Sequence, residues 1–187
     1  MSERDDLLAS IANTIQDYRT GEVAAPTPEH VDRWINQFDG GVQLPMLREM
    51  DHVLKRTYFS LETVTGFLRV LSGAEKLVGK DSCAFWHSVY FLDIQGGGNS
   101  QTEMLALFNE VIQEKCGFGI EQCGGESAVY VYLDDAIFTG NRVRRDLETW
   151  IKEQAPGMAT LHIVSIALHS GAQYYAGKFI SKAATAA

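Results

Sequence analysis

The sequence lacks the features that mark membrane proteins and broad nucleic-acid binders. None of its apolar runs approaches the roughly twenty residues that a membrane-spanning helix requires. Sixteen Lys and Arg residues stand against 24 Asp and Glu residues, which gives a formal net charge of -8. Proteins that wrap nucleic acids neutralise phosphates with clustered basic side chains, so this balance argues against extensive nucleic-acid binding. The charged N-terminus has no apolar signal core, and a cytoplasmic location is expected.

Cysteine is scarce too, and several catalytic motifs are missing. Cys83, Cys116 and Cys123 are odd in number and include no CxxC pair, so we expect neither a disulfide framework nor a zinc site. No loop ends in the GK[ST] of a P-loop, and no serine lies in a nucleophile elbow. ATP hydrolysis of the P-loop type and catalysis by a serine triad are therefore not expected.

What the sequence does contain is enough apolar material for one α/β domain with a helical extension. Hydrophobic residues make up 45% of the 187 positions and charged residues 21%, which is an ordinary globular composition. Helical periodicity dominates the first part of the chain, and helices are expected near residues 7–15, 28–38, 44–56 and 61–71. Thr27 is expected to cap the second of these helices, and Gly40 with Gly41 to end it.

Beyond Gly79 the pattern changes to strand, loop and helix in turn. Short β-branched and aromatic runs predict strands at residues 89–94, 128–133 and 161–168. Alternation of this kind implies right-handed crossovers and a mainly parallel sheet. We therefore predict an N-terminal helical region over residues 1–78 and an α/β domain over residues 79–187.

The segment from Val129 to Val143 carries the most specific signal. An apolar strand is expected to end in Asp134 and Asp135, and a turn with Thr139 and Gly140 then opens a helix. Free backbone N–H groups at such a helix start favour an anion, and the Thr139 hydroxyl can donate to a phosphate oxygen. Because two carboxylates repel a phosphate, sugar hydroxyls or a hydrated Mg²⁺ ion are expected between them. The pattern favours a phosphorylated, polyhydroxylated ligand over the alternative, an acidic cap for the next helix.

A glycine-rich loop after the first predicted strand is the second candidate. It consists of Gln95, Gly96, Gly97, Gly98, Asn99 and Ser100. Glycines at this place let backbone amides face an anion, although a flexible turn is an equal alternative. The loop itself contains no Lys or Arg. The one dense basic run, Arg142, Arg144 and Arg145, is expected to be a solvated helix face.

The segment from Val129 to Val143 resembles the signature of type I phosphoribosyltransferases, in which a strand precedes two acids and a Thr-Gly phosphate loop. The resemblance implies a Rossmann-like, mainly parallel sheet and a catalytic role for Asp134 and Asp135 on the ribose of phosphoribosyl pyrophosphate. It implies that these two carboxylates hold Mg²⁺, with Asp93 contributing through water; a turn cap is the alternative role for Asp93. The 5′-phosphate would be held by Ala136, Ile137, Phe138, Thr139, Gly140 and Asn141. The glycine-rich loop would lie on the pyrophosphate side.

Other parts of the chain are similar to a phosphoribosyltransferase-like group that accompanies bacterial antiphage systems, including retron-type cassettes. This second resemblance lies in residues 31–38, residues 92–95, Ser100 and Gln101. It implies a role in defence, with a protein partner in a defence complex. The alternative function is a catalytically inactive sensor or effector subunit that binds a nucleotide or a protein. The lack of a basic residue in the glycine-rich loop favours this alternative, whereas the intact acid and Thr-Gly motif favours the enzyme. A third possibility is that the helical region is the docking surface within a defence complex.

Overall fold

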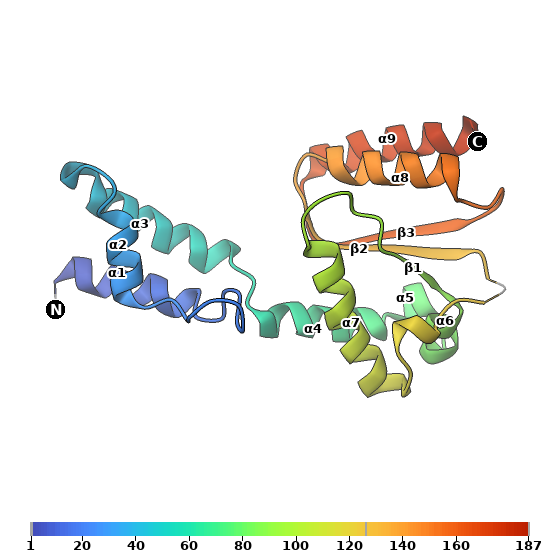
Figure 1. Ribbon diagram of the computed structural model, residues 1–187, viewed down its shortest axis with the longest axis horizontal. Helices are drawn as coiled ribbons and strands as arrows, with labels where there is room; N and C mark the ends of the chain where they lie inside the picture. The colour runs from blue at the N-terminus through green and yellow to red at the C-terminus, as the bar shows by residue number, and fades with distance from the viewer. Residues whose placement is uncertain (1, 126, 187) are drawn as a thin grey trace. The chain divides into compact units, whose positions relative to one another are not determined.

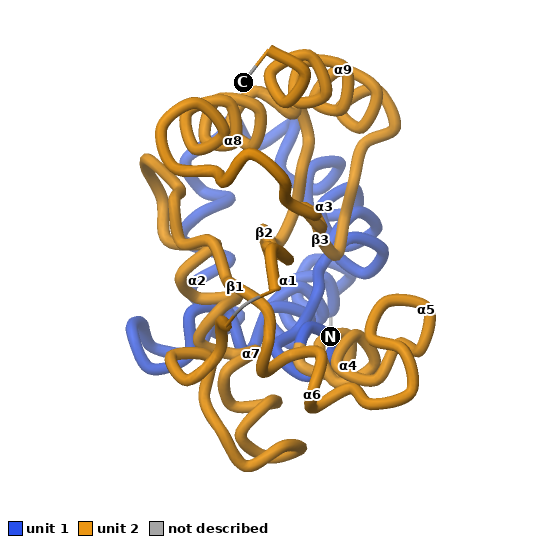
Figure 2. Tube along the Cα trace, turned by 90° about the vertical axis from the view of Figure 1, so that its right-hand side faces the viewer, with its two compact units in different colours: residues 1–64 blue, residues 65–187 orange. Residues whose placement is uncertain are grey.

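The computed structural model describes residues 2–125 and 127–186, which form two compact units. Unit 1 is Met1–Val64 and unit 2 is Thr65–Ala187, coloured blue and orange in Figure 2. A compact set of contacts does not test which part folds alone, so the domain boundary at residue 78 stays a prediction. In the described ranges, no helix has both the length and the apolar character needed to cross a bilayer.

Unit 1 is helical and has its own apolar core. It contains α1 (Glu3–Thr14), α2 (Pro28–Ile35) and α3 (Gly40–Thr57). The predicted cap of α2 is confirmed, since Thr27 Oγ1 accepts a hydrogen bond from the His30 N–H at 3.3 Å. Gly40 and Gly41 do not end a helix as predicted, because neither takes a positive φ and both lie in the first turn of α3. The core consists of Leu8, Ile11, Ala12, Val31, Ile35 and Leu47.

The remaining elements begin with three helices, after which strands and helices alternate. They are α4 (Leu61–Ser72), α5 (Glu75–Val78), α6 (Ser82–Ser88), β1 (Tyr90–Leu92), α7 (Ser100–Cys116), the 3₁₀ turn η1 (Ile120–Gln122), β2 (Val129–Ile137), α8 (Asn141–Glu153), β3 (Thr160–Leu168) and α9 (Ser170–Ala186). The short helices α5 and α6 were not predicted, because segments of four and seven residues are too short to show helical periodicity.

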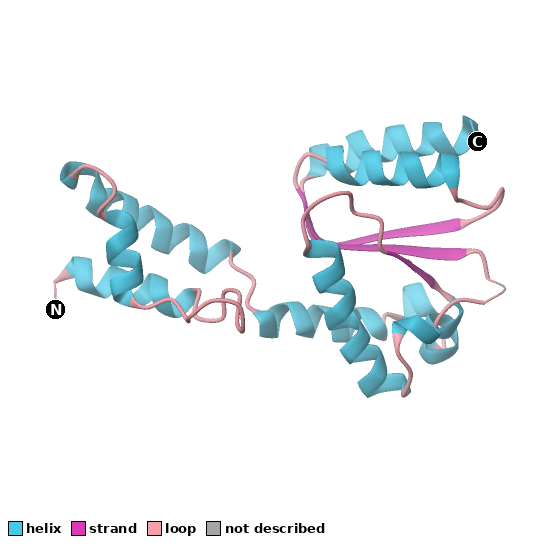
Figure 3. Cartoon of the chain, viewed as in Figure 1, coloured by secondary structure: helices cyan, strands magenta, loops and turns pink. Residues whose placement is uncertain are grey.

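The three strands form one parallel sheet in the order β1-β2-β3 (Figure 3). Tyr130 of β2 lies opposite Tyr90 on one side and Leu161 on the other. Figure 1 shows α8 and α9 on one face of the sheet and α7 on the other, and α7 packs on β2. The predicted α/β class and parallel sheet are confirmed. The Rossmann-like phosphoribosyltransferase type is a finer claim that stays a prediction.

The central strand β2 is longer than predicted and contains the two adjacent acids. It continues to Ile137 because β3 is long enough to pair with it as far as Leu168. Successive side chains of a strand point to opposite faces. Asp134 and Asp135 therefore point to opposite faces; Asp134 is only 4% exposed, whereas the Asp135 side chain is exposed. The two adjacent carboxylates are thus one buried and one exposed group.

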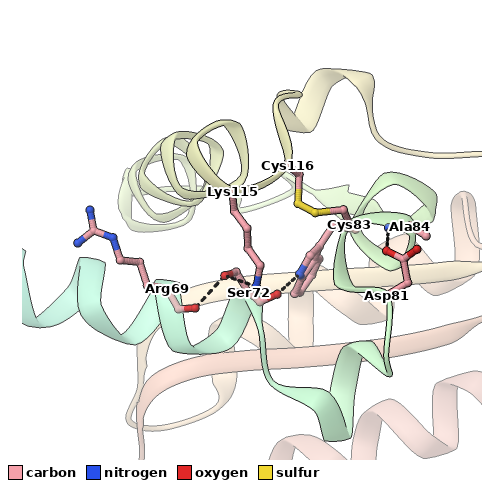
Figure 4. The surroundings of a disulfide bond; sticks show 8 residues. Arg69, Ser72, Asp81, Cys83, Ala84, Lys115 and Cys116 are labelled. Carbon is pink, nitrogen blue, oxygen red and sulfur yellow. Dashed lines mark hydrogen bonds between the residues drawn. A yellow bond between two sulfur atoms is a disulfide. The ribbon is translucent and has the colours of Figure 1, made fainter.

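A disulfide links Cys83 of α6 to Cys116 at the end of α7 (Figure 4). Cys123 is free. The expectation of no disulfide was wrong. The two cysteines lie 33 residues apart, and the fold brings their Cα atoms to 5.5 Å, within the range that a disulfide requires. An odd count and the absence of a CxxC pair say nothing about such a long-range approach, which only the packing of α6 against α7 creates.

Candidate functional site

A cavity of about 440 Å³ lies where β2 gives way to α8. Ligands of parallel α/β sheets bind at this carboxyl end of the strands, and the volume lies in the usual range for small-molecule sites. Its walls are Ser100, Asp134, Asp135, Ala136, Ile137, Phe138, Thr139, Gly140, Arg142 and Val143. The structure thus brings most of the predicted phosphate loop, both acids and the last residue of the glycine-rich loop to one place.

Asp134 is the most strongly constrained polar group of this cavity. Its carboxylate accepts hydrogen bonds from Ser100 Oγ at 2.9 Å, from its neighbour's backbone N–H (Asp135) at 3.0 Å and from Gln95 Nε2 at 3.4 Å. Burial raises the pKa of Asp134 above its ordinary value, and the hydrogen bonds from Ser100 and Asp135 only partly oppose this effect. Burial thus raises the free energy of the charged carboxylate. A ligand that donates hydrogen bonds to it offsets that penalty.

The raised pKa of Asp134 predicts a pH-dependent stability. The stability that this carboxyl group contributes is fully present below its pKa in the unfolded chain, about 3.9. It is lost as pH rises through the higher pKa of the same group in the folded protein. The wild type is therefore expected to lose unfolding free energy as pH rises above 4. Asp134→Asn is expected to lose less, so that its stability relative to the wild type increases between pH 4 and pH 7. Urea unfolding of ligand-free protein at several pH values measures this. Asp93→Asn, at an exposed carboxylate, is the control; an unchanged pH slope in Asp134→Asn would contradict the prediction.

Two glutamines hold the ends of the glycine-rich loop. Gln101 is fully buried, and its Oε1 accepts hydrogen bonds from the backbone N–H groups of Ile94 at 2.7 Å and Gln95 at 3.0 Å. In return, Gln95 Oε1 accepts from the Gln101 N–H at 3.3 Å and lies 3.2 Å from Ser100 Oγ, whose single proton is donated to the closer Asp134. The exposed glycines of the loop thus lie between two ends that hydrogen bonds hold in place. Since Gln95 also contacts Asp134, this network ties the loop to β2.

The start of α8 provides donors for an anion. Gly140 has a φ of +74° and precedes the helix, while the Asn141 N–H donates to Thr139 Oγ1 at 3.3 Å. Arg142 and Val143 are the second and third residues of α8, so their backbone N–H groups have no acceptor within the helix. Both residues line the cavity. The predicted phosphate loop therefore offers backbone donors and a helix N-terminus to the cavity.

Some predicted residues lie outside the walls of the cavity. Asp93 accepts a hydrogen bond from Thr102 Oγ1 at 3.2 Å in the first turn of α7, a contact of the capping kind. Asn141 and the residues of the glycine-rich loop before Ser100 border the cavity without lining it.

The residues present fit a magnesium ion only together with a phosphorylated ligand. In residues 2–125 and 127–186, no group of three or more His, Cys, Asp or Glu side chains converges on a metal position. Mg²⁺ does not need such a cluster, since it keeps several waters and takes one or two carboxylates plus substrate oxygens. Asp134 and Asp135, which both line the cavity, are the hard oxygen ligands for an ion of this kind. Mg²⁺ binding stays a prediction.

Arg142 is the cavity residue that the sequence did not single out. The basic run was expected to be a solvated helix face. Arg142 and Arg145 are exposed, as expected, whereas Arg144 is partly buried. Arg144 pairs with Glu148 at 2.7 Å and lies over the Phe179 ring. Arg142 alone lines the cavity. Because it lies on α8, far along the chain from the glycine-rich loop, a search for basic residues within that loop could not find it.

One protein family matches the part of the chain that contains the cavity and the sheet. The family model PRTase-CE, a phosphoribosyltransferase-like family, matches residues 31–186 and so includes the cavity, both loops and the three strands. Neither a curated protein nor a solved structure matches the chain.

Proposed function

This chain belongs to the PRTase-CE family, and from that membership we propose that it binds phosphoribosyl pyrophosphate, or a related sugar phosphate or nucleotide, together with Mg²⁺. The observation that carries the proposal is the composition of one cavity. Carboxylates of Asp134 and Asp135 line it together with Thr139 and the free N–H groups at the start of α8. A ligand with both sugar hydroxyls and a phosphate satisfies these two sets of groups at once.

Each set of groups has a distinct role in the proposal. Ribose hydroxyls donate to the carboxylates of Asp134 and Asp135, which removes the penalty of the buried charge on Asp134. The 5′-phosphate accepts from the backbone N–H groups after Gly140 and from the Thr139 hydroxyl. With a bound acceptor, the two carboxylates would also stabilise the positive charge that develops on the ribose during phosphoribosyl transfer. The parallel sheet with helices on both faces supports a Rossmann-like phosphoribosyltransferase type.

The alternative of a catalytically inactive sensor has lost its main support. It was favoured because the glycine-rich loop contains no basic residue, and Arg142 now supplies a guanidinium beside that loop. A role in antiphage defence, with a protein partner, is part of the proposal as well. Its support is the resemblance carried by residues 31–38 and 92–95.

A binding experiment tests the proposed ligand. Calorimetric titration with phosphoribosyl pyrophosphate and Mg²⁺ is expected to show binding by the wild type. The double substitution Asp134→Asn with Asp135→Asn is expected to weaken it by at least about 100-fold, because hydrogen bonds to charged groups contribute about 1.5–3 kcal/mol each and two such groups are changed. Glu153→Gln, at the exposed far end of α8, is the control for loss of a negative charge.

Two results would overturn the proposal: no binding by the wild type, or equal binding by the wild type and the double variant. Release of pyrophosphate over a panel of bases then separates the two candidate functions. Turnover by the wild type, lost in the double variant, is the result expected for a transferase. Tight binding without release would identify a sensor.

A further inference from the structure

The guanidinium of Arg142 lies directly against the glycine-rich loop. A β-carbon added at Gly98 would lie 2.8 Å from Arg142 Nη1 and 3.7 Å from its Cζ. Gly98 has a φ of +86°, a conformation that favours glycine, so the loop backbone approaches the arginine at a residue without a side chain. Arg142 thus extends from the first turn of α8 across to the loop that follows β1, and it lines the cavity between them.

This guanidinium has no carboxylate partner in the described part of the chain, where the ion pairs involve other residues. Asp146, one helical turn further along α8, instead accepts a hydrogen bond from the Tyr132 hydroxyl at 3.3 Å. Asp134 is satisfied by Ser100, Gln95 and a backbone N–H. An unpaired guanidinium beside a loop of exposed backbone amides is a site for an anion, because its planar donors match two phosphate oxygens.

We propose that Arg142 of α8 supplies the positive charge for the pyrophosphate group that binds at the glycine-rich loop. The inference rests on the proposed function and narrows it. The backbone N–H of Arg142 lies with the donors for the 5′-phosphate, while its side chain reaches the glycine-rich loop on the other side. A single residue thereby serves two separate anionic groups.

This arrangement also explains the composition of the glycine-rich loop. The loop supplies backbone amides, and the positive charge comes from α8. A side chain at Gly98 would displace the arginine, since its β-carbon would lie closer to Nη1 than an ordinary contact allows. The resemblance had placed the basic group within the loop; the structure instead divides charge and backbone donors between two elements.

The test compares two simple probes, inorganic pyrophosphate with Mg²⁺ and ribose 5-phosphate, by calorimetry. Arg142→Ala is expected to weaken pyrophosphate binding about 10- to 100-fold, the effect of losing a charge-assisted bidentate contact. Binding of ribose 5-phosphate is expected to change less than about threefold, because the backbone N–H groups remain. Arg142→Lys is expected to recover part of the loss, since lysine keeps the charge but not the planar pair of donors.

Arg145→Ala is the matched control, because it removes an exposed arginine from the same helix outside the cavity walls. Equal melting temperatures of the variants and the wild type establish that each is folded. If Arg142→Ala keeps full pyrophosphate affinity, or loses both probes equally, the inference is wrong. Wild type that binds ribose 5-phosphate but not pyrophosphate overturns this inference alone. Wild type that binds neither these probes nor phosphoribosyl pyrophosphate overturns the proposed function and the inference with it.

Discussion

Replacing Trp86 by alanine is expected to lower the free energy of unfolding by about 3–5 kcal/mol, the range for truncating a fully buried large aromatic residue. Trp86 is 0% exposed, and its Nε1 donates to the Ser72 carbonyl at 2.8 Å. Its ring packs against Phe91 of β1 and Phe108 of α7, with centroids 5.9 and 4.9 Å away. The substitution therefore opens a cavity and leaves a buried carbonyl without its donor. Urea unfolding monitored by circular dichroism measures the loss.

Two further variants separate these contributions. Trp86→Phe keeps a ring but removes the donor, and it is expected to lose about 1–3 kcal/mol, the penalty of an unsatisfied buried acceptor. Tyr174→Ala removes an aromatic side chain that is 74% exposed, and it is expected to stay within about 0.5 kcal/mol of the wild type. A loss in Trp86→Ala no larger than in Tyr174→Ala would show that Trp86 does not hold α4, β1 and α7 together.

Local patterns predicted the elements of this fold well where the signal lies within a few residues. Thr27 with Pro28 is a helix start that depends on one turn of backbone, and it was found. The three strands were also found, because each is a run of apolar and β-branched residues bounded by loops, and their alternation with helices fixed the parallel sheet. Their ends were less accurate. The end of β2 depends on how far β3 runs beside it, which no residue of β2 encodes alone.

The candidate site shows the same division between local and long-range information. The acid and Thr-Gly motif is contiguous, so its residues were expected together, and all but Asn141 line one cavity. The different burial of Asp134 and Asp135 could not be predicted, because the strand was expected to end at Leu133 and instead runs through both residues to Ile137. The meeting of Arg142 with Gly98 and the linkage of Cys83 to Cys116 are contacts between distant segments. Spacing along the chain does not carry such contacts.

Gly140 is the position where the fold and the proposed phosphate site depend on the same backbone. Its φ is +74°, and a β-carbon there would lie 3.0 Å from the Ala172 carbonyl oxygen and 3.2 Å from the Ala176 β-carbon, both on α9. A left-handed conformation costs a non-glycine residue about 1–2 kcal/mol, and overpacking costs typically another 1–3 kcal/mol. Gly140→Ala is therefore expected to lower the free energy of unfolding by about 2–5 kcal/mol.

The same substitution is expected to weaken ligand binding, because the N–H groups of Arg142 and Val143 directly follow Gly140 and take their direction from it. Urea unfolding and titration with ribose 5-phosphate measure the two effects on one preparation. Gly97→Ala is the matched control: this glycine has no positive φ and nothing within 4 Å of an added β-carbon. It is expected to remain within about 0.5 kcal/mol of the wild type. Wild-type stability in Gly140→Ala would mean that α9 moves away freely, and that the approach of the β2–α8 turn to α9 is not a constraint on the site.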